Sequence, residues 1–264
     1  MASSAGVRPG RGTTWRSRHV AENRTVPPLV ANRLYLAAAI LIALGLLCFP
    51  LVLSGVLSHS GVADLDRPVE LWINTQRNPF STPVMIIMTV AFGPVVLPVI
   101  ILMAVLVWSV AAKHVWRPLI LGAAMVTGVI IANTIAFIIQ RQRPPTSLML
   151  IGNDTTFSFP SGHILGASDF LVITAFLLVS RSPTIGRALT ALAIAWIGIF
   201  AEIYSRLYLG YHWLTDGLAS LSISIVIVGV VIAVDTRHRS RAGARHSREV
   251  GGSGGPTVPP SQRR

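Results

Sequence analysis

A titratable ring and a carboxylate lie four residues apart in the stretch SRLYLGYHWLTDG, which runs from Ser205 to Gly217. If the turn that holds His212 and Asp216 is helical, the two side chains share one face. A carboxylate that accepts one ring N–H of an imidazole fixes its tautomer and leaves the other nitrogen free to attack. The pair is therefore a candidate nucleophile with its orienting acid, and Arg206 adds a cation. The alternative is an interfacial histidine beside a helix-capping aspartate.

A second polar cluster, FPSGH, ends at His163 and has the composition of an anion site at the start of a helix. Ser161 is of a type preferred as an N-cap. Gly162 has no side chain, so a ligand can approach the backbone closely. Unpaired N–H groups and the positive end of the helix dipole favour phosphate at such a terminus. The alternative is an ordinary Pro-Ser-Gly turn.

A third cluster, RQRPP, places Arg141 and Arg143 together. Guanidinium groups stay charged and fork onto phosphate oxygens. Three cations, a helix N-terminus and two histidines can hold a phosphoryl group and stabilise its equatorial oxygens during in-line transfer. The sequence contains no HExxH motif, acidic cluster or Cys/His spacing typical of a metal site, so neither a metal nor another cofactor is predicted.

The elements that must position these groups are apolar. The chain of 264 residues is 52% hydrophobic and 12% charged, whereas soluble domains carry about 25% charged residues. Six apolar runs lie near the roughly 17–25 residues that cross a bilayer as a helix. They cover about 34–57, 84–111, 118–139, 163–180, 188–205 and 214–234. The first run exceeds the roughly 7–15 apolar residues of a secretory signal, so it is interpreted as a retained span.

The predicted fold is an all-α polytopic membrane bundle of six transmembrane helices, in which the three polar clusters lie at one end of spans three to six. The six-span domain covers residues 34–234. A basic N-terminal tail, 1–33, and a basic, Gly/Pro-rich C-terminal tail, 235–264, are predicted to be disordered and cytoplasmic.

The distribution of charge predicts the orientation in the membrane. The formal net charge is +12, and the two tails hold six and seven arginines. Such tails indicate anchoring beside anionic membrane lipids rather than a nucleic-acid partner. Loops 112–117 and 181–187 are also basic, so both termini are predicted on the cytoplasmic side of the cell membrane. The polar clusters then face the extracytoplasmic side, where their arginines oppose the charge rule and are expected to have a functional reason.

The three clusters resemble the signature motifs of the type 2 phosphatidic acid phosphatase (PAP2) superfamily. The matching residues are RP at Arg143–Pro144, PSGH at 160–163 and SRxxxxxHxxxD at Ser205–Asp216. The resemblance is to bacterial lipid phosphate and undecaprenyl pyrophosphate phosphatases, and it implies a core like that of vanadium haloperoxidases. It also implies metal-independent hydrolysis of a lipid phosphate or pyrophosphate, of the polyprenyl pyrophosphate, phosphatidic acid or phosphatidylglycerophosphate type.

The resemblance also implies roles for single residues. His212 would attack phosphorus and form a phosphohistidine, Asp216 would orient it, and His163 would protonate the leaving oxygen and then activate water. The groups that would bind phosphate oxygens are Arg143, Ser161, Gly162 and Arg206. The family's first motif usually begins with a lysine at the position of Ala136, and Arg141 is the candidate to replace that cation.

Two carboxylates inside predicted spans complete the candidate set, because intramembrane acids are functional candidates by default. Glu202 is expected to pair with Arg206, four residues on, and Asp169 is expected to bond Asn133 or another polar group. Both are predicted to support the site structurally without touching the substrate. Two other functions stay open at this point: a lipid phosphotransferase that uses the same phosphohistidine, and a transporter or lipid-binding protein without chemistry.

Overall fold

The computed structural model describes residues 26–112, 115–181 and 183–252, and the regular structure of these residues is entirely helical. The elements in chain order are α2 (Pro28–Ser58), η1 (Gly61–Leu65), α3 (Asp66–Thr75), α4 (Ser81–Ala91), α5 (Val96–Ala112), α6 (Trp116–Ile139), η2 (Thr146–Leu148), α7 (Gly162–Val179), α8 (Ile185–Tyr208) and α9 (Leu214–Gly252).

Five of the described helices are long and apolar enough to cross a membrane: α2, α6, α7, α8 and α9. The pair α4 and α5 is apolar enough as a unit but is bent by 54°. Pro94 lies in the break between these two helices, where proline cannot continue the hydrogen-bonded ladder. Counted as one broken span, the pair completes the six-span all-α bundle, so the predicted fold class is confirmed.

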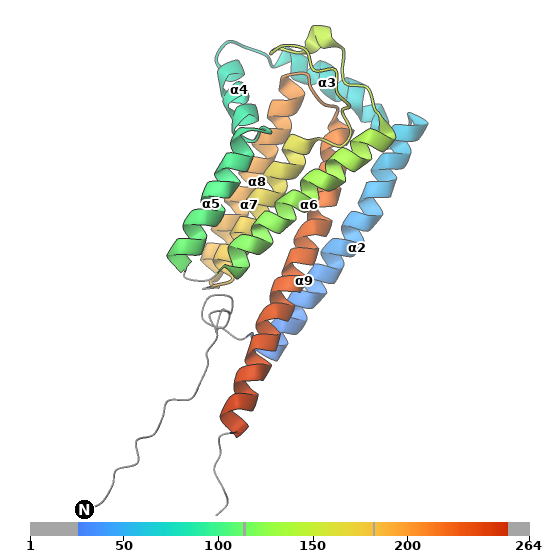
Figure 1. The fold of residues 1–264 in the computed structure, drawn as a ribbon. Helices are drawn as coiled ribbons and strands as arrows, with labels where there is room; N and C mark the ends of the chain where they lie inside the picture. Colours follow the sequence, from blue (N-terminus) through green and yellow to red (C-terminus); the bar gives the residue numbers. More distant parts are fainter. Residues whose placement is uncertain (1–25, 113–114, 182, 253–264) are drawn as a thin grey trace, which may run out of the picture.

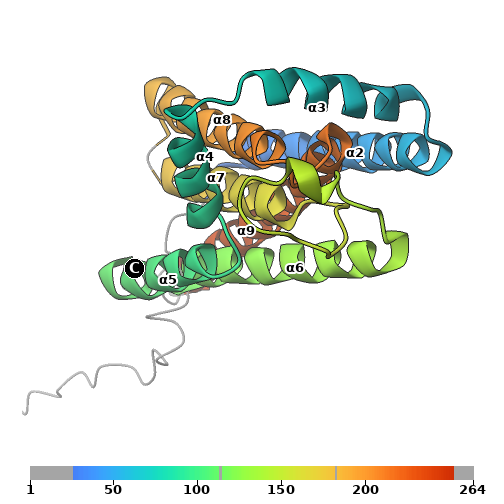
Figure 2. The same ribbon diagram turned by 90° about the horizontal axis from the view of Figure 1, so that it is seen from above.

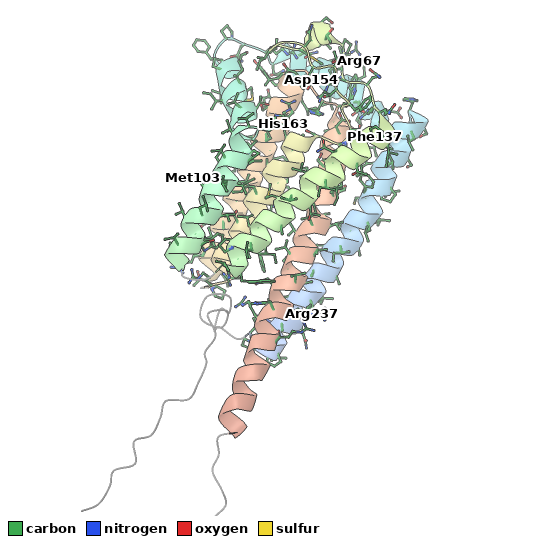
Figure 3. The ribbon with its side chains drawn as sticks, viewed as in Figure 1. Arg67, Met103, Phe137, Asp154, His163 and Arg237 are labelled. Carbon is green, nitrogen blue, oxygen red and sulfur yellow. The ribbon has the colours of Figure 1, made fainter. Side chains whose placement is uncertain are left out.

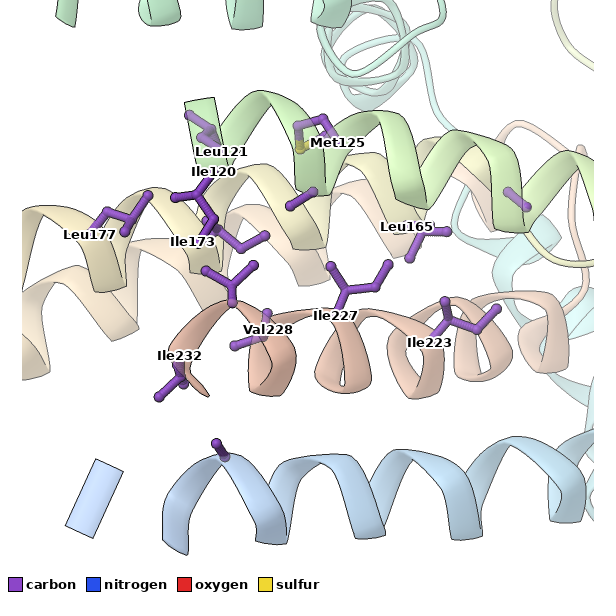
Figure 4. Packing of buried hydrophobic residues seen from close by; sticks show 14 of the residues in the cluster. Ile120, Leu121, Met125, Leu165, Ile173, Leu177, Ile223, Ile227, Val228 and Ile232 are labelled. Atoms are coloured by element: carbon purple, nitrogen blue, oxygen red, sulfur yellow. The ribbon is translucent and has the colours of Figure 1, made fainter. Parts of the chain in front are cut away.

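The bundle is built around α7, which packs against α6, α8 and α9, while α2 runs alongside α9 (Figures 1 and 2). Side chains from α6, α7 and α9 meet in the apolar core, among them Leu121, Leu165 and Ile227 (Figure 4). Helix α3 lies across one end of the bundle, above the ends of the long helices (Figure 1). The same end carries all three polar clusters.

Helices α2 and α9 approach closely because glycine replaces a side chain at two crossing points. A Cβ added to Gly45 would lie 2.5 Å from the carbonyl oxygen of Ser222 on α9. One added to Gly229 would lie 2.9 Å from the carbonyl oxygen of Ala38 on α2. Small residues at such crossings allow backbones to approach each other, which is how helices associate in lipid.

The chain turns toward the polar end where α6 stops. Gln140 adopts the left-handed conformation, with φ 52°, and its N–H bonds the carbonyl oxygen of Ala136. This is a common way for a helix to end. The two prolines that follow, Pro144 and Pro145, then favour an extended backbone. Arg141 and Arg143 therefore lie outside the helix and reach the N-terminal end of α9.

The structure differs from the sequence prediction at the ends of the outer helices. Helix α2 begins at Pro28 rather than near residue 34, because proline is well suited to a first helical position. Helix α9 continues through Gly252, beyond the boundary predicted at residue 234. An ion pair within the helix, Asp235–Arg239 at 3.6 Å, supports this extension. The remaining predicted tail segments, 1–25 and 253–264, lie outside the described residues.

Candidate active site

The imidazole of His212 is held by both of its nitrogens. Its Nδ1 lies 2.9 Å from the carbonyl oxygen of Ser158 and 3.3 Å from Oδ2 of Asp216. Its Nε2 lies 3.1 Å from Nη1 of Arg143. Since a guanidinium can only donate and a carbonyl can only accept, these partners favour a proton on Nδ1 and a free lone pair on Nε2. This is the tautomer that a nucleophilic histidine needs.

Asp216 is positioned by the start of α9. Its Oδ2 accepts a hydrogen bond from the backbone N–H of Trp213 at 2.9 Å, which is one half of a capping box. The same oxygen faces His212, so the helix terminus fixes the carboxylate that holds the ring. Both side chains are buried, and the predicted i, i+4 pair is therefore present as a contact.

Burial and charge both disfavour a proton on His212. The pKa of its imidazole lies well below the ordinary value of 6.5, first because the ring is buried and then because Arg206 and Arg143 add positive charge nearby. The carbonyl of Ser158 opposes this shift in the pKa without reversing it. The ring is consequently neutral in the neutral pH range, with its Nε2 lone pair available.

Arg143 faces the site from the loop after α6. Its Nη1 donates to the carbonyl oxygen of Tyr211 at 2.7 Å, and its Nη2 lies 3.0 Å from Oδ2 of Asp154. Burial acts to raise the pKa of the Asp154 carboxyl, but hydrogen bonds from Thr156 and the charge of Arg143 lower it overall. Asp154 therefore remains an anion that orients the guanidinium of Arg143 beside His212.

The start of α7 contributes the groups of the second motif. The Ser161 hydroxyl caps the helix and accepts from the N–H of Ile164 at 3.4 Å. Ser161 is buried, whereas Gly162 is exposed and has open space where a Cβ would lie. The next residue, His163, lies at the upper end of α7 below the loop of Asp154 (Figure 3). It is within electrostatic reach of Arg206, His212 and Arg143.

Arg206 lies at the end of α8 and bonds a neighbouring helix. Its Nη1 donates to Oγ1 of Thr89 on α4 at 2.9 Å, and its guanidinium lies over the Tyr211 ring, 4.7 Å from the centroid. Neither carboxylate oxygen of Glu202 has a hydrogen-bond partner among the described residues. Glu202 and Arg206 therefore lie within electrostatic reach of each other, as predicted, but no hydrogen bond joins them among the described residues.

Asp169 lies deeper in the bundle, on α7. Its Oδ1 accepts from Oγ of Ser224 on α9 at 2.6 Å. Its partner is thus Ser224, and no hydrogen bond joins it to Asn133 among the described contacts. Asp169 and Asn133 both line a cavity of about 190 Å³.

This cavity begins at the candidate site and extends into the membrane-spanning part. Gly162 and His163 line one end, and most of the remaining wall is apolar. The wall comes from the break between α4 and α5, from α5, from α6 and from α7, with Leu97 and Met125 among its residues. A headgroup at the polar end would therefore leave an attached hydrocarbon chain in apolar surroundings.

Arg141 is placed differently from the other predicted phosphate ligands. Its Nη1 lies 2.5 Å from Oδ1 of Asp216 and 2.7 Å from Oγ1 of Thr215. Its Nη2 lies 2.6 Å from Oδ2 of Asp66. These contacts hold Arg141 beside the carboxylate that faces His212, and the replacement by Arg141 of the cation missing at Ala136 stays a prediction.

Three polar contributors were missed in the sequence: Asp66, Asp154 and the Ser158 carbonyl. Asp66 and Asp154 stand in connections between spans, where no periodicity marks them. The only available signal was indirect. Arginines stand at the ends of the spans, and an arginine that is buried there needs an acid as its counter-ion. A backbone carbonyl leaves no signal in a sequence.

Comparisons with known proteins agree with the motif resemblance. Residues 117–240 match the model of the PAP2 superfamily. The chain is 25% identical over 195 residues to phosphatidylglycerophosphatase B of Bacillus subtilis (strain 168), covering 73% of this chain and 94% of that protein.

The fold is also that of a solved structure, a transmembrane PAP2 type phosphatidylglycerolphosphate phosphatase from Bacillus subtilis. The TM-score is 0.66 at 23% identity, and the match covers 74% of this chain and 96% of the other. All three motif clusters lie within the matched residues 117–240. This segment of the chain therefore belongs to the PAP2 superfamily.

Proposed function

We propose that this membrane protein hydrolyses a phosphate monoester or pyrophosphate carried on a lipid, through a phosphohistidine formed at His212. One observation supports the proposal above the others: both ring nitrogens of His212 have fixed partners. Nδ1 faces the Ser158 carbonyl and Asp216, while Nε2 faces Arg143, a group that binds phosphate oxygens. A neutral histidine so held can deliver its lone pair to phosphorus in line with the leaving oxygen.

In the first step, Nε2 of His212 attacks phosphorus, the N–P bond forms and the bond from phosphorus to the lipid oxygen breaks. His163, protonated once the negative charge of the bound phosphate offsets the nearby Arg206 and Arg143, gives its proton to that leaving oxygen, so a neutral alcohol departs. The charge that develops on the three equatorial oxygens is stabilised by Arg143, Arg206 and the first N–H groups of α7, at Gly162 and His163. The N–H of Ser161 donates to the carbonyl oxygen of Asp216 at 3.5 Å, so Ser161 contributes as the cap of α7.

In the second step, the now neutral His163 takes a proton from water as the water oxygen attacks phosphorus. The N–P bond breaks, inorganic phosphate forms and His212 returns to its starting state. Asp216 faces the Nδ1–H of His212 throughout and stabilises the positive charge of the phosphorylated ring. The scheme routes no step through a metal, and the residues described include no group of three or more His, Cys, Asp or Glu side chains that could hold one.

The apolar cavity beside His163 supports a lipid substrate, because a hydrocarbon chain can lie in it while the headgroup reaches His212. The Bacillus subtilis relative is named for its action on phosphatidylglycerophosphate, which makes this lipid the first candidate. Phosphatidic acid and polyprenyl pyrophosphate present the same terminal phosphoryl group and complete the proposed class.

The test is phosphate release by purified protein in detergent with EDTA, with these three lipids as substrates. We expect release by the wild type and inhibition by vanadate, which mimics five-coordinate phosphorus. His212→Asn should abolish release. His59→Asn should not, because His59 is exposed and follows the C-terminal end of α2. No release from any of the lipids by a folded wild-type protein would contradict the proposal.

Two alternatives from the sequence are separated by product analysis. A phosphotransferase would move the phosphoryl group from His212 to an added alcohol or lipid and release little inorganic phosphate. A transporter or lipid-binding protein would keep its transport or binding in His212→Asn. The fixed tautomer of His212 favours chemistry, by either enzyme, over transport or lipid binding alone.

We further propose that the polar end faces the extracytoplasmic side of the cell membrane, with both termini cytoplasmic. The start of α2 and the later turns of α9, which carry Arg237, lie at the end of the bundle opposite to α3 (Figures 1 and 3). The end of α7 and the start of α8, which flank the basic connection of Arg181 and Arg187, lie at that end too, and positive charge favours the cytoplasmic side. In a Cys48→Ser background, a cysteine placed at exposed Ser60 should react with an impermeant thiol reagent in intact cells. Reaction only after the cells are opened would reverse this orientation.

A further inference from the structure

We propose that Asp66 is a positioning residue for the phosphoryl-transfer site and acts through Arg141 on Asp216. The inference rests on the proposed function and adds to it a group from outside the three motif clusters. Asp66 is the first residue of α3, the short helix that lies across the end of the bundle (Figure 1). It touches neither His212 nor the phosphate-binding groups, so any effect on catalysis must pass through other residues.

Asp66 is buried and bonds the first turn of α9 with both oxygens. Its Oδ1 accepts from the backbone N–H of Thr215 at 2.9 Å, and its Oδ2 accepts from Oγ1 of Thr215 at 2.7 Å. The first N–H groups of a helix have no partner within the helix. Asp66 therefore caps α9 from an element 149 residues away in the sequence, directly beside the residue that orients the nucleophile.

The guanidinium of Arg141 joins two carboxylates. Nη2 lies 2.6 Å from Asp66 and Nη1 lies 2.5 Å from Oδ1 of Asp216. Such a bridge needs a planar group with separate nitrogens, which arginine has and lysine lacks. Asp66 thereby fixes the Arg141 nitrogen that meets Asp216.

The bridge divides the work of Asp216 between its two oxygens. Oδ1 is taken by Arg141, so Oδ2 alone faces Trp213 N–H and Nδ1 of His212. Without the bridge, the carboxylate could rotate about its terminal torsion, which is broad for aspartate. The expected consequence is a misdirected His212 ring, with phosphate binding left intact.

The contacts favour a positioning role for Arg141 over the role of a phosphate ligand. As a phosphate ligand it would point its nitrogens into open space beside His212. Instead its nitrogens meet Asp66, Thr215 and Asp216, and its side chain is 16% exposed. Arg143 and Arg206, by contrast, both lie close enough to act electrostatically on His212.

The experiment compares Asp66→Asn, Asp66→Glu and Arg141→Lys with the wild type in full-length protein. Asn keeps an acceptor for the Thr215 N–H but turns an amide toward Arg141. Lys keeps a cation that can still bind phosphate as a point charge but cannot span Asp66 and Asp216. Matched controls are Asp64→Asn, two residues earlier and exposed, and Arg67→Lys, whose ion pair with Glu70 lies outside the bridge.

The measurements are kcat and KM for a lipid phosphate, the inhibition constant of vanadate and the melting temperature in detergent. We expect kcat to fall on the order of 10²-fold in Asp66→Asn and Arg141→Lys, the scale set by a misplaced reacting group. KM and vanadate inhibition should stay unchanged. Asp66→Glu should recover part of kcat. The double variant Asp66→Asn/Arg141→Lys should lose no more kcat than either single variant, since the effects of groups that act as one unit do not add.

Arg141→Lys keeps the inference testable if the Asp66 variants do not fold. A wild-type kcat in a folded Asp66→Asn or Arg141→Lys protein, while His212→Asn is inactive, would overturn this inference alone. So would a raised KM and weaker vanadate inhibition with kcat preserved, because Arg141 would then be a phosphate ligand. A wild type that releases no phosphate from any lipid would overturn the proposed function and this inference together.

Discussion

The Nε2 atom of His212 lies 3.1 Å from Nη1 of Arg143, a donor that approaches the nitrogen expected to attack phosphorus. The contact keeps the lone pair of Nε2 directed toward a cation while no substrate is bound. When a phosphate arrives, its oxygens can replace the ring as the acceptor of Arg143, and the lone pair is released toward phosphorus. In the proposed mechanism, the same guanidinium therefore holds the nucleophile in its active tautomer and then binds the group that it attacks.

The first prediction concerns pH. Burial, followed by the charges of Arg206 and Arg143, lowers the pKa of His212 well below 6.5. The neutral ring is the attacking form, so the loss of kcat/KM caused by His212 protonation should set in only well below pH 6.5. Arg143→Gln removes one positive charge, which raises the pKa of His212 and should move this acidic limb to higher pH. The profiles are measured with a soluble phosphate ester whose own ionisation is subtracted.

Arg143→Gln should also weaken phosphate binding and so lower kcat/KM at every pH. The quantity to compare is therefore the pH at which the acidic limb falls, and not the maximum of kcat/KM. Arg181→Gln, at the opposite end of the bundle, is the charge control and should leave the limb in place. An acidic limb at or above pH 6.5 in the wild type would contradict the lowered pKa.

A second prediction follows from the two acceptors of Nδ1. In a triad where one aspartate alone holds the ring, aspartate-to-asparagine exchange costs about 10⁴-fold in kcat because the tautomer is lost. Here the Ser158 carbonyl, at 2.9 Å, still holds Nδ1–H when Asp216 is changed. Asp216→Asn should therefore reduce kcat by only about 10²- to 10³-fold. The loss would come from the missing negative charge that stabilises the positive phosphorylated ring, and not from a wrong tautomer.

The tautomer itself can be checked by nitrogen NMR of labelled His212 in Asp216→Asn. A proton that stays on Nδ1 supports the argument. A proton that moves to Nε2, with a loss near 10⁴-fold, would show that Asp216 alone holds the ring.

Much of the site was predictable because its chemistry is concentrated in short motifs. His212, His163 and Arg206 stand out as titratable or charged groups at the ends of apolar runs, and lipid makes such groups costly without a function. The six spans were predictable for a related reason: about 20 consecutive apolar residues leave few alternatives to a membrane helix.

The contacts of Arg141 were not predictable, because one of its partners is distant in the sequence. Asp66 lies in a connection that reads as a loop, and the amphipathic helix that it begins was not predicted. Its contact with Thr215 spans 149 residues. Sequence proximity to RP suggested a phosphate ligand, whereas the fold turns Arg141 toward two acids that only the packing of α3 on α9 brings together.

A third prediction tests the apolar cavity as the site of the lipid chain. Val129 lines the cavity on α6, whereas Val126, three residues earlier, lies outside it and is similarly exposed to lipid. Val129→Trp should fill the cavity. Losing the burial of two CH₂ groups, about 1.6 kcal/mol, would raise KM for a long-chain lipid phosphate by about tenfold.

The matched variant, Val126→Trp, should leave that KM unchanged. Neither variant should alter hydrolysis of a soluble phosphate ester that has no chain to place. An equal rise in KM for the long-chain and soluble substrates in Val129→Trp would mean that the change disturbs His163 rather than the chain.

The last prediction concerns the pairing of α2 and α9, which positions the first turn of α9. A Cβ on Gly45 would lie 2.4 Å from Cγ2 of Val226 and 2.5 Å from the Ser222 carbonyl oxygen. The backbone oxygen cannot move without the helix, so Gly45→Ala should destabilise the protein by about 1–3 kcal/mol, the usual cost of overpacking. Gly186→Ala is the matched control, since a Cβ there meets nothing within 4 Å and alanine favours the helix by up to about 1 kcal/mol. Melting in detergent should therefore shift downward for Gly45→Ala only, and a shift of equal size in both variants would indicate a general effect of the added methyl group rather than a close helix crossing.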